Sequence, residues 1–354
     1  MIISKIASKS TSGTMKYMDT FIYDPTATDS QSKVRGIGRF VQTLKEILPK
    51  DVVFTSDTSK IPYDSVFINP FINLIQTPVV NKRLAKIQIG VIHDVIPLQF
   101  PKHFPIGVRG AINVWKNKRS LKNYDLIVTD SEVSQKNILK QLPLRKNGVR
   151  VVFPTLPKTF SSQATENTKY QMPNTKYFIY VGDVTWNKNL VNLAKAVQMA
   201  DATCVFVGKT FIDEVPLNSW TKEFHEFMNL AKNDKRFIFP GFVSDEDLKI
   251  LYKNSVANIL VSREEGLGFS YVEAASQKTS SILSDIDIFH ETAGDTAIFV
   301  DPENPRNIAD VLKKIVTEEK KLATLGQKAF ERWQSLFEPT DRWADLLTSL
   351  QTQQ

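Results

Sequence analysis

The chain has 354 residues, of which 42% are hydrophobic and 23% charged, a balance that suits two globular domains with ordinary cores. Its single cysteine, Cys204, excludes an intrachain disulfide framework and a cysteine-based zinc site. Residues 1–13 contain no apolar block of signal-peptide length, and the longest uncharged stretch, 65–80, is too short and too polar to span a bilayer. We therefore expect a cytoplasmic protein.

The net charge of +7 is unevenly distributed along the chain. Residues 1–160 carry 24 basic and 11 acidic side chains, a net charge of +13, whereas the remainder carries 21 and 27, a net charge of −6. This asymmetry predicts that the first half faces an anionic partner. Because no nucleic-acid motif accompanies it, we favour peripheral contact with the inner membrane face, or a phospholipid-linked acceptor, over nucleic acid.

Apolar runs alternate with helical patterns, which predicts parallel sheets with crossover helices. In the first half we expect strands at 19–23, 52–55, 66–69, 87–92, 126–129 and 149–153. Helices are expected at 39–48, 107–121 and 132–142. The polar stretch 156–176 has no sustained apolar period and is predicted to be a linker.

A second series of the same kind follows. Strands are expected at 177–181, 203–207, 237–239, 257–261, 281–283 and 297–300. Helices are expected at 190–199, 219–231, from Ser244, from Phe269, and at 306–316, 320–337 and 341–350. We predict an α/β protein with two doubly wound domains, 1–160 and 161–330, and terminal helices (331–354) that cross back to the first domain. Ligands should bind at the carboxyl ends of the strands, in a crevice between the domains.

The loop after the strand expected at 257–261 carries the strongest functional signal. Residues 262–275 read Ser-Arg-Glu-Glu-Gly-Leu-Gly-Phe-Ser-Tyr-Val-Glu-Ala-Ala. The glycines allow backbone N–H groups at the helix start to approach phosphate or sugar oxygens. Glu265 and Glu273, eight residues apart, could accept hydrogen bonds from vicinal hydroxyls. The alternative is a helix N-terminus with solvated glutamates.

This stretch resembles the E-x7-E element of the retaining glycosyltransferases of family four, which adopt the two-domain GT-B fold. The resemblance implies that Glu265 contacts the transferred hexose and that Glu273 contacts the nucleotide ribose. It also implies that the turn between them contacts the donor, at Gly266, Gly268, Phe269 and Ser270. Ser270 departs from the pattern, because the family usually has proline there.

Residues 180–190, Tyr-Val-Gly-Asp-Val-Thr-Trp-Asn-Lys-Asn-Leu, resemble the family's glycine loop, whose lysine binds the donor diphosphate. The resemblance implies donor contacts at Gly182 and Lys188. A lysine there would stabilise the departing pyrophosphate, as a metal ion does in other enzymes. Asn187 and Asp183 stand where the family often has arginine. The alternative for Lys188 is a solvated helix residue.

Two further glycine turns resemble family segments. Residues 36–40, Gly-Ile-Gly-Arg-Phe, resemble a strand-to-helix turn, which implies donor contacts at Gly36 and Gly38 and places Arg39 near the sugar or acceptor. Residues 240–244 resemble the turn that borders the nucleotide base. This resemblance implies donor contacts at Gly241, Phe242 and Val243.

Residues 90–97, Gly-Val-Ile-His-Asp-Val-Ile-Pro, resemble the family's His-Asp-x-x-Pro loop at a strand end. The resemblance implies a catalytic place for His93 beneath the reacting anomeric carbon and a sugar-proximal place for Asp94. A structural or solvent-facing histidine is the alternative. Ser131 lies in a turn that resembles the family's Ser-Glu turn; it is predicted to cap a helix first and to contact ligand second.

No metal or cofactor is expected. His103, His225 and His290 show no metal-ligand spacing. Asp285 and Asp287 spell the Asp-x-Asp of metal-dependent glycosyltransferases, but that motif belongs to a different fold, and we predict a helix-capping turn here.

A basic helical pattern has two interpretations, contact with anionic lipid or a pyrophosphate-linked acceptor, and a solvated helix face. It comprises Arg109, Lys116, Lys118, Arg119 and Lys122.

The resemblance implies retaining transfer of a hexose, with mannose as first choice, from a GDP- or UDP-sugar to a glycan or lipid-linked acceptor during polysaccharide synthesis. The leaving phosphate takes the acceptor's proton in this family, so no general base is predicted. The alternative is a catalytically silent nucleotide-sugar-binding subunit of a glycosylation complex, which the departures at Asp183, Asn187 and Ser270 leave open.

Overall fold

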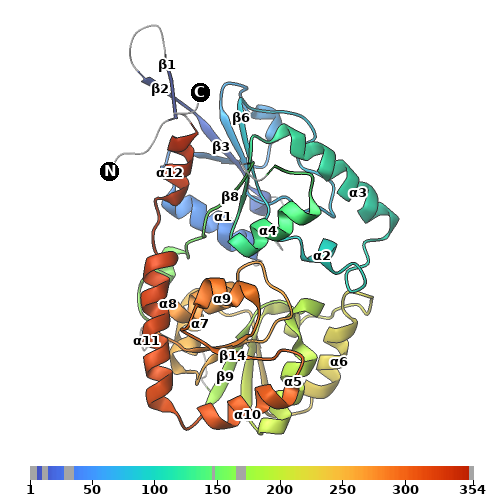
Figure 1. Cartoon of the computed structure of the whole chain (residues 1–354), viewed down its shortest axis with the longest axis vertical. Coiled ribbons are helices and arrows are strands. Elements are labelled where there is room, and N and C mark those ends of the chain that lie inside the picture. Colours follow the sequence, from blue (N-terminus) through green and yellow to red (C-terminus); the bar gives the residue numbers. More distant parts are fainter. Residues whose placement is uncertain (1–5, 10–14, 28–35, 146–147, 165–172, 351–354) are drawn as a thin grey trace. The chain divides into compact units, whose positions relative to one another are not determined.

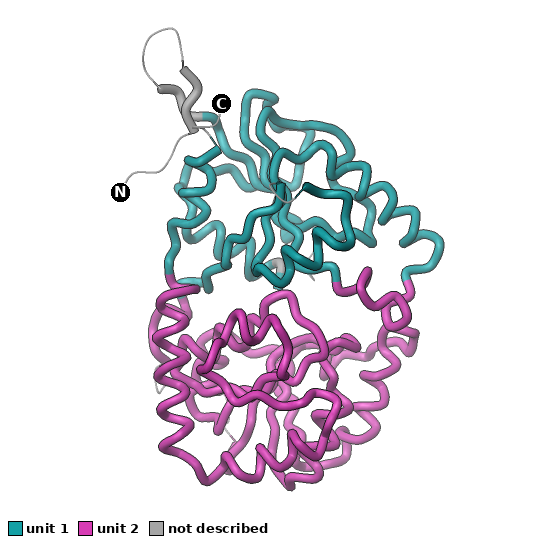
Figure 2. The backbone as a smooth tube through the Cα atoms, in the orientation of Figure 1, with its two compact units in different colours: residues 1–95, 106–158, 339–354 teal, residues 96–105, 159–338 magenta. Residues whose placement is uncertain are grey.

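The computed structural model describes residues 6–9, 15–27, 36–145, 148–164 and 173–350. They form two compact units (Figure 2). Unit 1 comprises residues 1–95, 106–158 and 339–354, and unit 2 comprises residues 96–105 and 159–338. Each unit contains one six-stranded parallel sheet flanked by helices (Figure 1), so the predicted α/β class is confirmed.

The sheet of unit 1 has the strand order β4-β3-β5-β6-β7-β8, with every pair parallel. Its strands are β3 (Thr20–Tyr23), β4 (Val53–Thr55), β5 (Val66–Asn69), β6 (Ile87–Val91), β7 (Leu126–Thr129) and β8 (Val149–Val151). Strands β5 to β7 are buried along their whole length, which explains their continuous apolar runs. The strand order reverses between β3 and β5.

The main helices of unit 1 are α1 (Gly36–Ile47), α3 (Gly107–Ser120), α4 (Glu132–Gln141) and α12 (Arg342–Ser349). Helix α1 begins three residues before the expected start. The first N–H groups of a helix have no intrahelical partner, so the glycines at 36 and 38 fit its first turn. Both glycines therefore lie inside the helix and not in a preceding turn.

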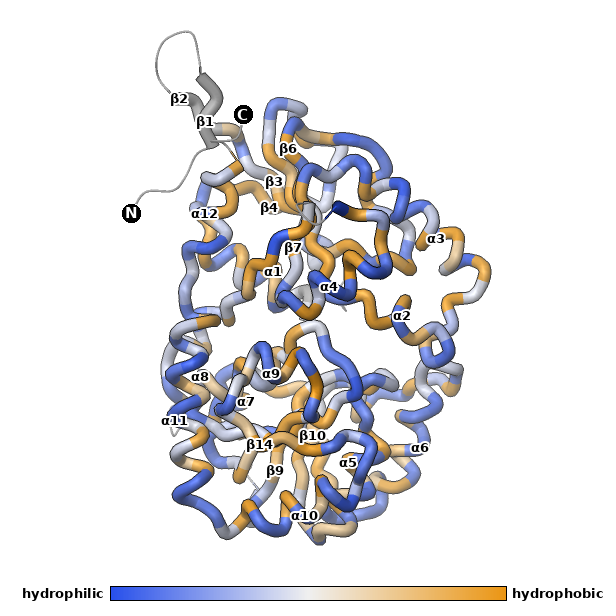
Figure 3. The backbone as a smooth tube through the Cα atoms, in the orientation of Figure 1, coloured by the Kyte–Doolittle hydropathy of each residue, from blue (hydrophilic) through white to orange (hydrophobic). Residues whose placement is uncertain are grey.

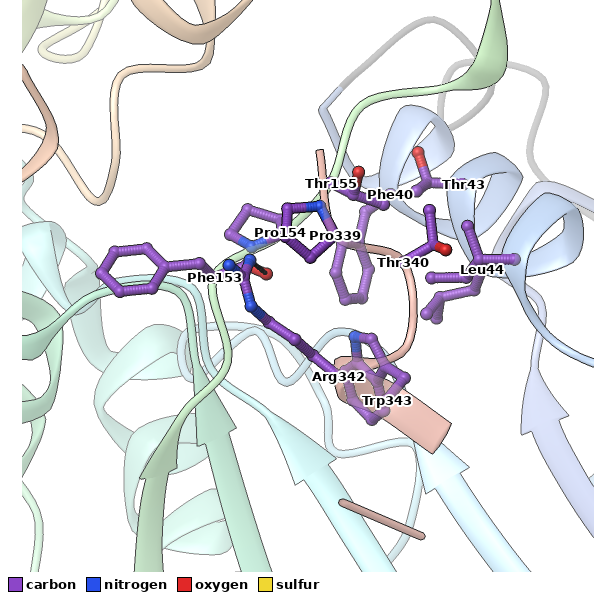
Figure 4. A pocket seen from close by; sticks show the side chains of 11 residues that line it. Phe40, Thr43, Leu44, Phe153, Pro154, Thr155, Pro339, Thr340, Arg342 and Trp343 are labelled. Atoms are coloured by element: carbon purple, nitrogen blue, oxygen red, sulfur yellow. Dashed lines mark hydrogen bonds between the residues drawn. The ribbon is translucent and has the colours of Figure 1, made fainter. Parts of the chain in front are cut away.

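The C-terminal helix α12 completes the core of unit 1. Trp343, Leu346 and Leu347 join one buried cluster with Phe40 and Leu44 of α1. A small hollow beside them is lined by α1, by residues 153–155 and by residues 339–343 (Figure 4). Arg342 donates to the carbonyl of Phe153 (3.3 Å).

The sheet of unit 2 has the order β11-β10-β9-β12-β13-β14, again with every pair parallel. Its strands are β9 (Tyr177–Val181), β10 (Thr203–Val207), β11 (Phe237–Gly241), β12 (Asn258–Leu260), β13 (Ser281–Ser284) and β14 (Ile298–Val300). Hydrophobic residues dominate β9 and β10 (Figure 3). The order reverses between β9 and β12, the kind of position where open α/β sheets bind ligands.

Two groups of helices pack together in unit 2, α5 against α6 and α10, and α8 against α7 and α11. The α-helices between residues 159 and 338 are α5 (Leu190–Ala200), α6 (Lys222–Ala231), α7 (Asp245–Asn254), α8 (Phe269–Ser276), α9 (Asp287–Ala293), α10 (Pro305–Ile315) and α11 (Glu319–Leu336). Helix α7 begins directly after Ser244, close to the expected start, and Ser244 caps it by accepting from the backbone N–H of Asp247.

The units differ from the expected domains at two places. Residues 96–105, with α2 (Ile96–Gln99), group with unit 2, and only residues 339–354 of the C-terminal segment group with unit 1. Aromatic packing explains the first difference, because Phe104 packs edge-on against Trp220, whose indole N–H donates to the carbonyl of Pro105 (3.0 Å).

Some local predictions were wrong or incomplete. Asp285 does not cap α9; the N-cap is Ile286, without a side-chain bond, and Asp285 instead pairs with His290 (Oδ1 to Nε2, 2.6 Å). The hairpin of β1 (Ile6–Lys9) and β2 (Met15–Met18) was not predicted.

Among the described residues, no group of three or more His, Cys, Asp and Glu side chains lies close enough together to hold a metal ion. No described helix combines the length and apolar content needed to cross a membrane.

Helix α11 crosses the turn after α8 at Gly326, where an added Cβ would collide with the carbonyl of Lys278. Gly326→Ala should therefore lower the free energy of unfolding by about 1–3 kcal/mol, despite alanine's better helix propensity. Gly36→Ala is the matched control, because open space surrounds Gly36. Urea unfolding followed by circular dichroism measures both, and equal midpoints would contradict the packing described here.

Candidate functional site

Two loops meet at the carboxyl edge of the unit 2 sheet. The first follows β9 and contains the short 3-10 helix η7 (Trp186–Lys188), which leads into α5. Asn189 joins η7 to α5 in the left-handed conformation (φ 58°). Its side-chain amide donates to the carbonyls of Val261 (3.0 Å) and Pro302 (2.6 Å), and these bonds fix the turn.

The second loop follows β12, the neighbour of β9, and ends at Gly268, the N-cap of α8. Gly268 has a φ of +89°, and an added Cβ would lie 2.6 Å from the ring of Phe289. Only glycine meets both demands. Gly266 lies half-buried in the same loop, and Phe269 is the first residue of α8.

Lys188 and Glu265 join the two loops through a direct ion pair. The ammonium Nζ lies 2.7 Å from Oε1 and 2.9 Å from Oε2 of Glu265. Ser262 Oγ donates to the same Oε1 (2.7 Å). The side chains are only 16% and 8% exposed. Desolvation makes such a pair costly, so these bonds hold both charges at a position that water barely reaches.

The two positions where the family often has arginine hold neutral or acidic groups. Asn187 is buried, and its amide donates to the carbonyl of Glu264 (3.0 Å). The backbone carbonyl of Asn187 accepts from the backbone N–H of Arg263 (2.7 Å). Asp183 accepts from the hydroxyl of Thr185 (2.9 Å). Asn187 therefore ties the loops together and adds no charge.

Arg263 was missed by the sequence analysis, yet it braces η7. Its guanidinium donates to the carbonyl of Trp186 (2.7 Å) and lies 5.0 Å from the Trp186 ring centroid. It also pairs with Glu223 and Glu303 (2.8 Å each).

His103 stacks on the indole of Trp186 with a centroid distance of 3.7 Å. Burial, then the positive charges of Arg263 and Lys102, lower the pKa of His103. These partners are too distant in sequence for any local pattern to reveal them.

The first turns of α8 hold two further predicted residues. Ser270 Oγ is buried and has no hydrogen-bond partner among the described residues. Glu273 is 2% exposed and accepts from the hydroxyl of Tyr252 (2.9 Å). An unpartnered buried hydroxyl at a helix start is a potential contact for a ligand.

The remaining predicted residues of unit 2 lie at the carboxyl ends of β9 and β11. Gly182 follows β9, and an added Cβ there would lie 2.8 Å from the hydroxyl of Tyr180. Gly241 ends β11 with a φ of +75°. Next to it, Phe242 is 62% exposed whereas Val243 is buried.

In unit 1, His93 lies beyond the end of β6 and joins three strand ends. Its Nδ1 lies 2.6 Å from Asp130 Oδ2, after β7, and its Nε2 lies 3.1 Å from the carbonyl of Pro70, after β5. Phe40 of α1 packs edge-on against the imidazole (4.8 Å). Both partners are hydrogen-bond acceptors, so the contacts favour a ring that carries a proton on each nitrogen.

Burial alone would lower the pKa of His93. The carboxylates of Asp130 and Asp94, together with the bond to Pro70, outweigh burial and raise the pKa above its ordinary value. With both ring nitrogens engaged, His93 has no free nitrogen to act as a general base in this arrangement.

Other predicted residues of unit 1 have clear places. Ser131 is fully buried and caps α4 by accepting from the N–H of Ser134 (3.0 Å), so its capping role is confirmed. Asp94 is half-buried beside His93. Arg39 is half-buried in the first turn of α1. Their ligand contacts stay predictions.

The raised pKa of His93 predicts pH-dependent stability. The contribution of the His93–Asp130 pair is fully present below the unfolded pKa of about 6.5 and is lost as pH rises through the higher folded value. His93→Gln should cost about 1–3 kcal/mol of unfolding free energy at mildly acidic pH and less at alkaline pH. Urea melts across the pH range, with Asp130→Asn as a second probe, measure this. A penalty independent of pH would contradict it.

Comparison with known proteins gives a family match that lies within unit 2. Residues 163–332 match the sequence model of the family described as glycosyl transferases, group 1. This range contains both loops and the ion pair between them. The six-stranded sheet of unit 1 lies outside this match.

Two relatives illustrate the sequence similarity. The O-antigen chain mannosyltransferase RfbU of Salmonella typhimurium is 24% identical over 235 residues, covering 66% of this chain and 62% of that protein. The serotype-specific mannosyltransferase WbdA of Escherichia coli is 33% identical over 267 residues, covering 70% of this chain and 30% of that protein. The chain therefore matches less than two thirds of the length of these relatives.

Solved structures show the same fold at low identity. Anabaena Alr3699/HepE in complex with UDP-glucose has a TM-score of 0.65 at 13% identity and covers 95% of this chain and 99% of that one. A glycosyltransferase from Rickettsia africae has a TM-score of 0.64 at 15% identity, with coverage of 95% and 98%. Residues 163–332 thus resemble the group 1 glycosyl transferases, and the chain with its two Rossmann-like sheets has the GT-B fold.

Proposed function

We propose that the chain transfers a hexose from a nucleotide-sugar to a glycan or lipid-linked acceptor. The observation that carries the proposal is the buried Lys188–Glu265 pair at the point where the strand order of the unit 2 sheet reverses. The match of residues 163–332 to the group 1 glycosyl transferases supports the reaction class.

In this proposal the donor separates the two charges. The ammonium of Lys188 turns to the diphosphate, and the carboxylate of Glu265 accepts hydrogen bonds from the hexose hydroxyls. Ser262 keeps one oxygen of Glu265 satisfied during the exchange. As the anomeric bond breaks, Lys188 stabilises negative charge on the leaving oxygen inside a site that excludes most water.

Two observations support further donor contacts. The buried, unpartnered hydroxyl of Ser270 can donate to a phosphate or sugar oxygen at the start of α8. The exposed ring of Phe242 offers an apolar surface to the nucleotide base. Glu273, oriented by Tyr252, then takes the ribose hydroxyls.

We assign unit 1 to the acceptor and leave the reaction without a general base. His93 is kept as a positioning residue, because its nitrogens are bound to Asp130 and Pro70. The acceptor's proton passes to the leaving phosphate oxygen, so atoms and charges balance without a dedicated side chain.

Mannose from a GDP-sugar is our first choice of donor. Several relatives are mannosyltransferases by name, and one is the D-rhamnosyltransferase WbpZ of Pseudomonas aeruginosa. A UDP-sugar is the second choice, because the Anabaena neighbour was solved with UDP-glucose. The relatives' role in O-antigen chains supports a place in polysaccharide synthesis.

A second candidate function is a silent nucleotide-sugar-binding subunit of a glycosylation complex. Asn187 and Asp183 favour it, because neither supplies a cation for the leaving diphosphate. Donor binding without transfer to any offered glycan or lipid-linked acceptor would support this candidate over the enzyme.

A thermal-shift screen tests donor binding. A ligand that binds only the native state raises the melting temperature, so one class among UDP-, GDP-, dTDP- and ADP-sugars should raise it selectively. The midpoint with GDP-mannose should exceed the midpoint with GDP alone, because only the sugar can reach Glu265. If none of these donors shifts the midpoint at saturating concentration, the donor site is wrong.

Substitution of the pair tests catalysis. Lys188→Ala and Glu265→Ala should each reduce transfer by more than about tenfold, because each removes a charged side chain that contacts the donor in this proposal. The exposed Lys176–Glu319 pair (2.8 Å), which precedes β9 at the opposite edge of the sheet, is the matched control. Lys176→Ala and Glu319→Ala should leave transfer unchanged. Wild-type rates in a folded Lys188 or Glu265 variant would refute that residue's role.

A further inference from the structure

Helix α3 in unit 1 has its polarity reversed relative to an ordinary surface helix. Its buried residues are Gly110, Asn113, Asn117 and Ser120. Its exposed face carries Val108, Ile112 and Trp115, which are 80%, 48% and 58% exposed. A surface helix of a globular protein normally turns such apolar residues to the core.

Amide hydrogen bonds explain how the polar face packs. Asn117 donates to the carbonyls of Leu74 (3.0 Å) and Gln76 (2.7 Å), and Asn113 donates to the carbonyl of Ile75 (3.1 Å). These bonds hold α3 against the loop at 73–76. Polar contacts therefore anchor the helix, while Val108, Ile112 and Trp115 remain exposed.

The exposed apolar residues form one stripe. Spacings of four and three residues place Val108, Ile112 and Trp115 on the same helix face. Arg119 continues this row, and its guanidinium lies 5.1 Å from the Trp115 ring centroid. An apolar stripe with an aromatic ring and a long cation at one end is typical of helices that lie in a membrane interface.

The charge of α3 points to an anionic partner. The helix contains Arg109, Lys116, Lys118 and Arg119 and has no acidic residue in its fourteen positions. Arg109, Lys116 and Arg119 are exposed, and at helical spacing Arg109 and Lys116 flank one side of the stripe while Lys118 flanks the other.

We propose that α3 docks on a bilayer surface rich in anionic phospholipid. Val108, Ile112 and Trp115 enter the headgroup region, and the four cations contact lipid phosphates. This inference goes beyond the proposed function and does not depend on it, because it concerns binding to the bilayer alone. It also selects the lipid interpretation of the basic pattern over the solvated helix face.

The charge of α3 argues against a second copy of the chain as the partner that covers its apolar stripe. Two α3 helices packed on each other would bring eight cations to one apolar contact without a carboxylate from either helix. An anionic bilayer meets the apolar stripe and the cations at once. A self-association that depends on Trp115 would accordingly overturn the proposal.

Sedimentation of the full chain with vesicles tests the proposal. The chain should bind vesicles of phosphatidylcholine mixed with phosphatidylglycerol, bind phosphatidylcholine vesicles at least about tenfold more weakly, and be released by high salt. Lys116→Glu with Arg119→Glu should weaken binding more than about tenfold, since each cation near the surface contributes about fivefold. Ile112→Ser with Trp115→Ser should weaken it comparably at unchanged charge.

A matched control distinguishes binding through the α3 face from binding that depends only on the net charge of the chain. Lys232→Glu with Lys235→Glu makes the same change in charge, at the same spacing, on exposed residues of unit 2. This control should bind anionic vesicles like the wild type. The proposal is overturned if the control loses as much binding as the α3 variant, or if the Ser variant binds like the wild type. Equal melting temperatures show that all variants are folded.

Discussion

The buried ion pair of Lys188 and Glu265 is the interaction on which the proposed donor site depends. A cation and a carboxylate withdrawn from water are costly unless they are well bonded, and here two short contacts and the Ser262 hydroxyl supply the bonds. A ligand that carries an anion and adjacent hydroxyls can replace each partner by a matching group. In the proposed function, the pair is a resting arrangement that a nucleotide-sugar exchanges for its own contacts.

The fold places this pair by topology and by a few constrained residues. Lys188 follows β9 and Glu265 follows β12, and the reversal of strand order makes these strands neighbours. Asn189 fixes the first loop, and Gly268 turns the second into α8. Arg263 then bonds the backbone of one loop to the other. Small backbone features therefore decide where two ordinary charged side chains meet.

Unit 1 uses the same kind of strand-end geometry for a different purpose. His93, Asp130 and Pro70 link the ends of three parallel strands through one imidazole ring. Helix α3 lies in the same unit and presents apolar and basic residues to solvent. Unit 1 therefore combines strand ends that are joined by hydrogen bonds with a separate apolar and basic helix face.

Much of the fold could be predicted because buried parallel strands read as continuous apolar runs, as in β5, β6 and β7. The start of α1 could not, because glycine at 36 and 38 predicts a turn while the first helical turn tolerates it. Lys188 and Glu265 were identified through a resemblance, and their spacing of 77 residues carries no local signal. Arg263, Asp130 and Tyr252 were missed for the same reason.

The different roles proposed for Lys188 and Glu265 can also be tested by measuring ligand binding without the transfer reaction. Isothermal titration calorimetry should compare a nucleoside diphosphate with its nucleotide-sugar on the wild type, Lys188→Ala and Glu265→Ala. The account predicts that loss of Lys188 weakens both ligands, because both carry the diphosphate, whereas loss of Glu265 weakens only the ligand that carries a sugar. Equal weakening of both ligands by Glu265→Ala, or unchanged binding of the diphosphate by Lys188→Ala, would contradict it.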